Sequence, residues 1–277
     1  MPSTYAHYRL GQEIRSLLND SEEKEVIDEY PELFMIGIHG PDIFFYYKPL
    51  LDNQISKIGY RMHDRAGKEF FEIAAETIKQ HQENAAYLSY VYGFICHFAL
   101  DEICHGYIDE KIAASGISHT EIEVEFDRML MLKDGYDPIR HKLTGHIVPS
   151  MKNAQVIQAF FEGVNSTQIQ KALNGMIKNS NLLIAPSKIK RLLINTLLKI
   201  SGNYKEMHGL IVNYRENPQC ADSTKKLWNL YQKAKELTIE LIHEYKGYLE
   251  GREALNPIYN YTFDSRLTDE RVNNDEA

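Results

Sequence analysis

YVYGFICHFALDEICHGYI, residues 90–108, is the segment from which the architecture of this chain can be worked out. Apolar residues occupy almost every side of it over about five helical turns, which is typical of a helix buried on all sides. Side chains of metal-binding type recur within it at intervals of four residues, as His97, Asp101 and His105. Because each residue advances a helix by about 100°, steps of four keep all three on one face. The sequence therefore predicts a buried helix over residues 85–108 with one polar stripe.

That polar stripe predicts bound metal. Burying a carboxylate beside two imidazoles in an apolar helix is costly unless the charge is compensated, and a cation would turn the stripe into ligands. His97 and His105 lie about 12 Å apart along the helix axis, and each lies about 6 Å from Asp101. This spacing favours more than one ion, with Asp101 central and able to bridge. A hydrogen-bonded network without metal is the alternative interpretation.

The next predicted helix begins at Ser118 and carries a second candidate pair. Ser118 is a favourable N-cap residue, and Glu121 follows three residues later as in a capping box. His119 and Glu123 stand four residues apart at the start of this helix. An imidazole and a carboxylate at that spacing commonly chelate zinc, although an isolated pair is as often solvated.

The rest of the chain also favours helices. Apolar residues recur at offsets of three, four and seven, and no series of alternating strand residues is present. Gly40-Pro41 predicts irregular backbone just before Asp42. The fold class is therefore all-α, with further helices expected over residues 7–18, 21–30, 65–81, 156–164, 166–177, 189–200 and 223–249.

A single multi-helix domain is expected over residues 1–255. Its candidate metal ligands lie within residues 1–127, and residues 150–255 complete the helical core. Residues 256–277 become polar and acidic, which predicts a loose tail, with NPIYNYTF at its start as a packing anchor.

The charge balance argues against some partners. The chain has 39 acidic and 31 basic side chains and no long Lys/Arg stripe, so neither nucleic acid nor an anionic membrane is expected as a partner. No segment approaches the roughly 20 apolar residues of a membrane-spanning helix. The N-terminus lacks the basic start and apolar run of a secretory signal, which predicts a cytoplasmic protein. The sequence carries no signal of the oligomeric state.

Several motifs occur in the order found in a known family. They are STYAHYRLGQEI, GIHGPDIFFYY, RMHDRAGKEFF, GFICHFALDEICHGYID and SHTEIEVEFD, and they span Ser3 to Asp127. In the type and order of candidate ligands the chain resembles the zinc-dependent phospholipase C enzymes, which share their fold with the zinc-dependent fungal nucleases. The remaining half of the chain matches only as generic helices.

The resemblance implies a metal-dependent phosphoric ester hydrolase with two or three zinc ions. It assigns Asp42, His63, His97 and Asp101 to the first zinc, and His105, His119 and Glu123 to the second. It assigns His7 and the shared Asp101 to the third zinc, which the amino-terminal residue completes in the family. Asp42 is implied as the general base that activates water, and the implied substrate is a phosphodiester, with phospholipid among the candidates.

Two features next to candidate ligands depart from the family pattern. In the secreted lipases the next His follows the bridging Asp at a longer spacing than the four positions from Asp101 to His105. They also place an aromatic residue directly after the general base, where this chain has Ile43.

Several other readings stay open. His39, three residues before Asp42, is interpreted as an outer-sphere partner, an extra ligand or a loop histidine bonded to backbone. The remaining histidines, His81, His141, His146, His208 and His243, fit no ligand spacing. The doublet His63-Asp64 suggests an HD-type phosphohydrolase as one alternative. A non-catalytic metal-binding helical protein is the other.

Overall fold

The computed structural model describes residues 4–19, 21–81, 84–200, 202 and 204–267. Within these ranges the chain is all-α, and the β-type pairing consists of two isolated bridges, Ala66 with Thr262 and Tyr261 with Leu267. The helices are α1 Thr4–Leu17, α2 Glu22–Glu29, α3 Pro31–Gly37, η1 Gly40–Tyr46, α4 Gln54–His63, α5 Gly67–Gln80, α6 Asn84–Ser115, α7 His119–Lys133, α8 Met151–Gln158, α9 Ser166–Leu183, α10 Lys188–Ile200, α11 Tyr204–Met207, η2 His208–Leu210, η3 Pro218–Cys220, α12 Ala221–Leu249 and η4 Pro257–Asn260.

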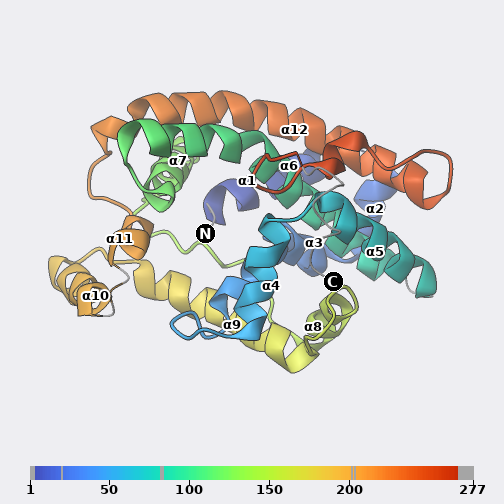
Figure 1. Cartoon of the computed structure of the whole chain (residues 1–277), viewed down its shortest axis with the longest axis horizontal. Coiled ribbons are helices and arrows are strands. Elements are labelled where there is room, and N and C mark those ends of the chain that lie inside the picture. The colour runs from blue at the N-terminus through green and yellow to red at the C-terminus, as the bar shows by residue number, and fades with distance from the viewer. Residues whose placement is uncertain (1–3, 20, 82–83, 201, 203, 268–277) are drawn as a thin grey trace, which may run out of the picture.

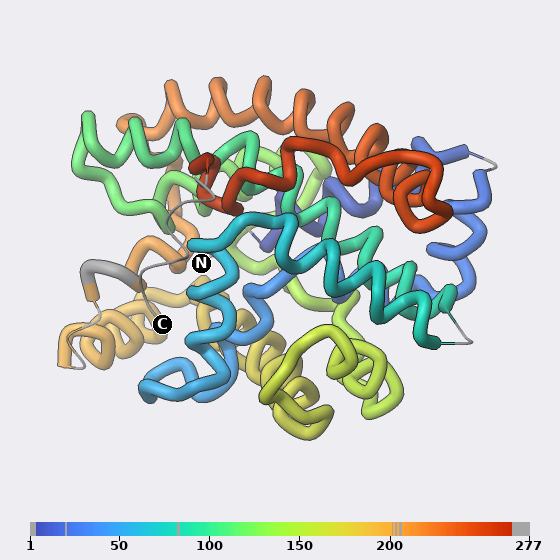
Figure 2. The backbone as a smooth tube through the Cα atoms, turned by 45° about the vertical axis from the view of Figure 1, so that its right-hand side comes forward, coloured from blue at the N-terminus to red at the C-terminus, as the bar shows by residue number. Residues whose placement is uncertain are grey.

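Helix α6 is the centre of the molecule, as its apolar sequence predicts. Its middle is buried on all sides, and α12 runs alongside it while α3 packs against it (Figures 1 and 2). A pair of glycines allows α3 to approach closely. A Cβ atom on Gly93 would lie 2.2 Å from the Phe34 carbonyl oxygen, and one on Gly37 would lie 2.2 Å from that of Tyr90. Larger residues at either position would separate the two helices.

One helix was not expected from the sequence, and another begins earlier than expected. Helix α4, which carries His63, was not expected, because only Ile55 and Gly59 of it are buried and its apolar periodicity is short. Asn53 begins it by accepting hydrogen bonds from the backbone N–H groups of Ile55 and Ser56 at 3.0 and 2.9 Å. Helix α8 starts at Met151 instead of residue 156, because the side chain of Ser150 caps it.

The segment expected to be a loose tail is packed over residues 256–267. Tyr259 and Phe263 are each 1% exposed, and both belong to the main hydrophobic core. Both belong to the NPIYNYTF motif, so the expectation of a packing anchor is confirmed, whereas the expectation of a loose segment is wrong for residues 256–267. Residues 268–277, the rest of the expected tail, lie outside the described residues.

Helix α10 is set apart from this core. Its buried residues Ile194 and Leu198 form a small second cluster with Ala185 and Ile211. Figure 1 shows α10 at the left edge of the molecule, beside α11. None of the described helices is long and apolar enough to cross a membrane.

Candidate metal centre

The eight candidate ligands come from five elements and meet in the interior. They include three sets in which the donor atoms of one set all lie within 4.8 Å of one another. The sets are His7 with Asp42 and His97, His63 with His97 and Asp101, and His105 with His119 and Glu123. Helix α1 supplies His7, η1 supplies Asp42 and α4 supplies His63, while α6 and α7 supply the rest.

Asp101 lies at the middle of the cluster. Its Oδ1 atom is 3.2 Å from His7 Nε2 and 3.7 Å from His105 Nε2. Its Oδ2 atom is 3.1 Å from His97 Nε2 and 3.7 Å from His63 Nε2. One carboxylate thus faces four imidazoles, which is the arrangement expected of a ligand that bridges cations.

Asp42 and Glu123 face the remaining imidazoles. Asp42 Oδ1 is 3.2 Å from His63 Nε2, and Asp42 Oδ2 is 3.9 Å from His97 Nε2. At the other end of the cluster, Glu123 Oε1 lies 3.2 Å from His119 Nε2 and 3.6 Å from His105 Nε2. Both carboxylates are at least 95% buried, so their charges are removed from water.

Local structure holds His7 and His97 in place. The Asp127 carboxylate accepts hydrogen bonds from the backbone N–H groups of Tyr5 and Ala6 at 2.9 and 2.8 Å, which caps the first turn of α1. Gly40 adopts a φ of +48°, and a Cβ atom there would lie 2.2 Å from Cδ2 of the His97 ring. The irregular backbone expected at Gly40-Pro41 is therefore present and lets η1 touch the ring.

The C-terminal segment orients His105, a feature that the sequence did not reveal. His105 Nδ1 lies 3.0 Å from the Phe263 carbonyl oxygen and 3.2 Å from Asp264 Oδ1. These acceptors fix the ring so that Nε2 faces Asp101 and Glu123. His63 is oriented similarly, because its Nδ1 lies 2.8 Å from the Gly59 carbonyl oxygen. Asp264 stands 159 residues from His105, and no local pattern connects them.

His39 pairs with a histidine that the sequence left unassigned. His39 Nε2 lies 2.7 Å from His146 Nε2, and the two rings stack with centroids 5.0 Å apart. The centroid of the His39 ring lies 6.4 Å from that of His7. Burial, together with the neighbouring His146, His7 and His97, lowers the pKa of His39 well below its usual value, which keeps this pair neutral.

The buried polar atoms of this cluster fit a cation. Asp42 Oδ1 and Oδ2, Asp101 Oδ2, Glu123 Oε2 and His97 Nε2 are buried and have no hydrogen-bond partner. Native proteins rarely leave such atoms unsatisfied. Nitrogen and carboxylate oxygen donors in groups of three and four are the ligands that zinc prefers, so the donor set fits zinc.

The pKa values show how strongly the carboxylates attract positive charge. Burial alone would lower the pKa of His63, but the Asp101 and Asp42 carboxylates close to its Nε2 outweigh burial and raise the pKa to about 10. Burial would likewise raise the pKa of Asp101, but the neighbouring His97, His105 and His7 hold it well below its usual value. The cluster is thus an anionic centre that takes up protons when it holds no metal.

A cavity opens directly onto these side chains. It has a volume of about 180 Å³ and is lined by Asp42, Phe45, Tyr60, His63, Asp64, Asp101, His105, His119 and Asp264. Asp64, the second residue of the HD doublet, is exposed and belongs to none of the three donor groups found among the described residues. The geometry therefore does not support an HD-type ligand pair.

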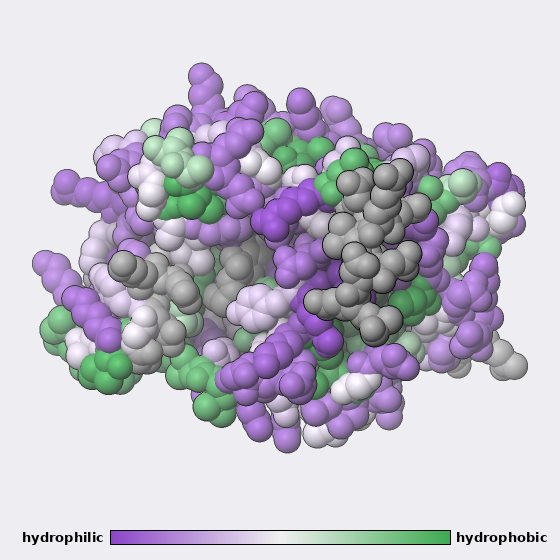
Figure 3. All heavy atoms as spheres, in the orientation of Figure 1, coloured by the Kyte–Doolittle hydropathy of each residue, from purple (hydrophilic) through white to green (hydrophobic). Residues whose placement is uncertain are grey.

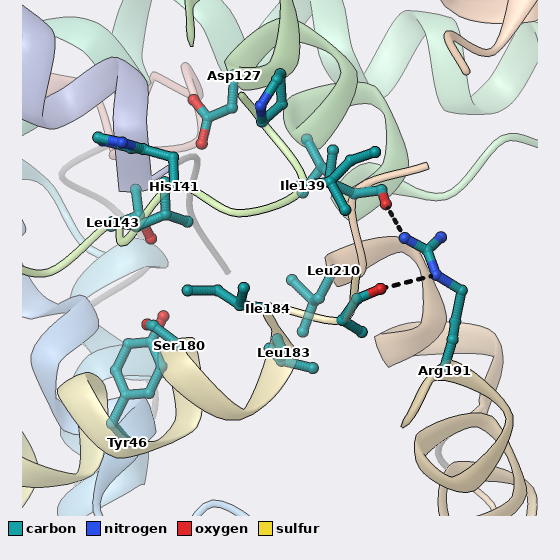
Figure 4. A pocket seen from close by; sticks show the side chains of 15 residues that line it. Tyr46, Asp127, Ile139, His141, Leu143, Ser180, Leu183, Ile184, Arg191 and Leu210 are labelled. Atoms are coloured by element: carbon teal, nitrogen blue, oxygen red, sulfur yellow. Dashed lines mark hydrogen bonds between the residues drawn. The ribbon is translucent and has the colours of Figure 1, made fainter. Parts of the chain in front are cut away.

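Figure 4 shows a different and smaller cavity of about 50 Å³, beside the start of α1. Asp127, His141, Ser180 and Arg191 contribute to its wall, but none of the eight candidate ligands does. It is therefore not part of the metal centre.

Comparison with known families gives an independent result. The family model described as zinc dependent phospholipase C matches residues 6–175, which is more than half of the chain. No curated protein and no solved structure gave a match. The matched region includes all eight candidate ligands. Because the match covers more than half of the chain and the fold is all-α, the chain belongs to the zinc-dependent phospholipase C family.

Proposed function

We propose that this protein hydrolyses a phosphodiester of the phospholipase C type, with two or three zinc ions bound by the buried cluster. The observation that carries this proposal is the cavity of about 180 Å³ whose wall is formed by five of the eight candidate ligands. A phosphodiester in this cavity would lie directly against the metal centre.

The charge of the cavity supports a metal-dependent reaction. Its described lining contains Asp42, Asp64, Asp101 and Asp264 but neither lysine nor arginine. This wall would repel an anionic phosphodiester if protons or cations did not compensate it. When bound, zinc would lower the pKa of a coordinated water and neutralise charge on the phosphate oxygens.

The ligand groups are those that the family resemblance implies, and the short distances among their side chains support them. We assign Asp42, His63, His97 and Asp101 to one zinc, and His105, His119 and Glu123 to a second. His7 and Asp101 form the described part of a third site. The contribution of the amino-terminal residue to that site lies outside the described residues.

Asp42 is assigned as the general base. It is 1% exposed, lines the cavity and has no hydrogen-bond partner on either oxygen. It would take a proton from the attacking water as the water oxygen bonds to phosphorus. The ester oxygen would leave with the bonding electrons and gain a proton, which gives an alcohol and a phosphomonoester.

The test combines metal analysis with one pair of variants. Elemental analysis of the purified protein should find two or three zinc ions per chain, and the protein should hydrolyse a chromogenic phosphodiester. Asp42→Asn that retains its zinc should show a kcat lower by roughly 100-fold or more, in line with the loss of a general base. Asp64→Asn is the matched control, because Asp64 lines the same cavity but is exposed and belongs to none of the three donor groups among the described residues.

The outcomes separate the three functions considered. Loss of zinc in Asp64→Asn would favour the HD-type phosphohydrolase. Bound zinc without hydrolysis of lipids, nucleotides or simple diesters would favour a non-catalytic metal-binding protein. Unchanged turnover in Asp42→Asn would remove Asp42 from its assigned role.

A further inference from the structure

Helix α10 presents an apolar ridge to solvent. Only Ile194 and Leu198 of its 13 residues are buried. The opposite side carries five aliphatic residues that are 60–79% exposed: Ile189, Leu192, Leu193, Leu197 and Ile200. At about 100° per residue these five fall within an arc of about 140°. Single exposed apolar residues are ordinary, but a continuous ridge marks a contact surface.

Basic residues border this ridge. Helix α10 contains Lys188, Lys190, Arg191 and Lys199 and no acidic residue, although the whole chain has a net charge of -8. On a helical projection Lys188 and Lys199 lie along one edge of the ridge, with Lys199 Nζ 4.9 Å from the centroid of the Tyr204 ring. Lys190 lies along the other edge and donates a hydrogen bond to the Ile184 carbonyl oxygen at 2.5 Å, so Lys188 and Lys199 are the cations that face the solvent at the border. The sequence shows no long basic stripe because aliphatic residues separate these cations along the chain. The helix brings the three lysines to the borders of one face, whereas Arg191 lies on its inner side.

The inner side of α10 is anchored, so the ridge has a fixed outward direction. Arg191 donates hydrogen bonds to the carbonyl oxygens of Ala185 and Val212 at 3.3 and 2.6 Å (Figure 4). Its guanidinium also lies 3.9 Å from the centroid of the Tyr214 ring. These contacts hold the inner side of the helix and leave the apolar ridge free.

A second exposed apolar site lies on the same side of the molecule. Leu50 and Leu51, in the loop between η1 and α4, are 66% and 63% exposed. Figures 1 and 2 both place this loop on the lower side, next to α4 and toward α10. Figure 3 shows hydrophobic surface at the lower left, over α10. A flat apolar surface that touched both sites would lie next to α4, whose Tyr60 and His63 line the cavity.

We propose that α10, together with Leu50 and Leu51, docks the protein on an anionic phospholipid bilayer. Interfacial helices of this kind insert an aliphatic face while lysines at its borders reach the headgroups. With 13 residues α10 is about 20 Å long, so it would lie in the interface and not span the bilayer. A second copy of the chain would place like charges next to each other, whereas anionic lipids complement them.

This inference goes beyond the proposed reaction, because it concerns attachment to the lipid surface and needs no turnover. The test is co-sedimentation of the full-length protein, in buffer that contains zinc, with vesicles of phosphatidylcholine alone or mixed with phosphatidylserine. All proteins carry Asp42→Asn, so that the vesicles stay intact if hydrolysis operates as proposed. The test variant is Leu193→Glu with Leu197→Glu. The matched control is Ile73→Glu with Leu132→Glu, which are 57% and 54% exposed on α5 and α7.

The parent protein should bind the mixed vesicles at least tenfold more tightly than vesicles of phosphatidylcholine alone. The reason is that each basic residue near an anionic surface raises the affinity roughly fivefold. Each inserted leucine contributes roughly tenfold, so the test variant should bind at least 30-fold more weakly. The control should stay within threefold of the parent, and both variants should melt at the parent temperature within a few degrees.

Two results would overturn the proposal. One is binding of the test variant equal to that of the control. The other is a lipid-free dimer, seen by sedimentation equilibrium, that the test variant dissociates, because the ridge would then serve a second copy. Neither result depends on whether the protein hydrolyses phosphodiesters.

Discussion

Replacing Asp264 by asparagine tests whether the C-terminal segment belongs to the metal centre. Asp264 Oδ1 lies 3.2 Å from His105 Nδ1, and its side chain is 24% exposed. A full charge at this distance would contribute about 5 kcal/mol at an effective dielectric constant of about 20. This value is an upper bound, because the exposed side chain is screened by water. Mutating a residue that orients a metal-binding histidine typically lowers metal affinity 10- to 100-fold.

The structure places the expected effect at the lower end of that range. The Phe263 carbonyl oxygen lies 3.0 Å from the same nitrogen, so the ring keeps one acceptor in Asp264→Asn. We therefore expect zinc affinity to fall about tenfold, or about 1.4 kcal/mol, at the site that contains His105, His119 and Glu123.

The assay is competition for zinc with a chromogenic chelator. Asp109→Asn is the control, because Asp109 is exposed, lies one turn beyond His105 on α6 and pairs with Arg266 at 3.5 Å. It removes the same charge without touching the ring. Zinc affinity of Asp264→Asn within twofold of the parent, or an equal loss in Asp109→Asn, would refute the reasoning.

Three further predictions follow from the same cluster. Zinc binds neutral imidazole, whereas His63 without metal has a pKa of about 10, so zinc binding at pH 7 should release a proton. The affinity for zinc should then rise with pH up to about 10 and weaken as pH falls. Calorimetry in buffers of different ionisation enthalpy would detect the released proton. Zinc binding without proton release would contradict the prediction. Gly40→Ala should destabilise the protein by at least about 2 kcal/mol, because φ is +48° and the added Cβ meets the His97 ring. Gly135→Ala, at φ +80° in open space, measures the backbone cost alone, and an equal fall in Tm would exclude the steric effect. Removing zinc with EDTA should lower Tm by more than about 5 °C, because zinc at about 100 times its Kd stabilises the folded protein by about 2.7 kcal/mol. An unchanged Tm would mean that these buried donors bind no ion.

Local geometry made part of the site predictable. His97, Asp101 and His105 share one helix, and the 3.6-residue period alone places them on one face. His119 and Glu123 are predictable for the same reason. The burial of α6 also follows from its composition, since a helix that is apolar on all sides has no stable exposed face.

Tertiary structure decided which distant residues join that face. His7 and Asp42 reach Asp101 and His97 only because α1 and η1 pack against α6, and the Gly40 turn places η1 on the His97 ring. Asp264 reaches His105 across 159 positions. No short-range pattern encodes these contacts, because they depend on the packing of whole helices.

Helix α10 also separates what the sequence predicts from what helix packing decides. Its periodicity predicts an amphipathic helix, yet an aliphatic face has the same pattern whether it packs inward or faces water. Arg191, held by two carbonyl oxygens, turns Ile194 and Leu198 inward and leaves Leu193 and Leu197 outside. The sequence therefore determined most of the local helices, although not α4, and the ligand stripe of α6. The packing of the helices determined which side chains converge and which apolar face remains uncovered, because burial is a property of the whole fold.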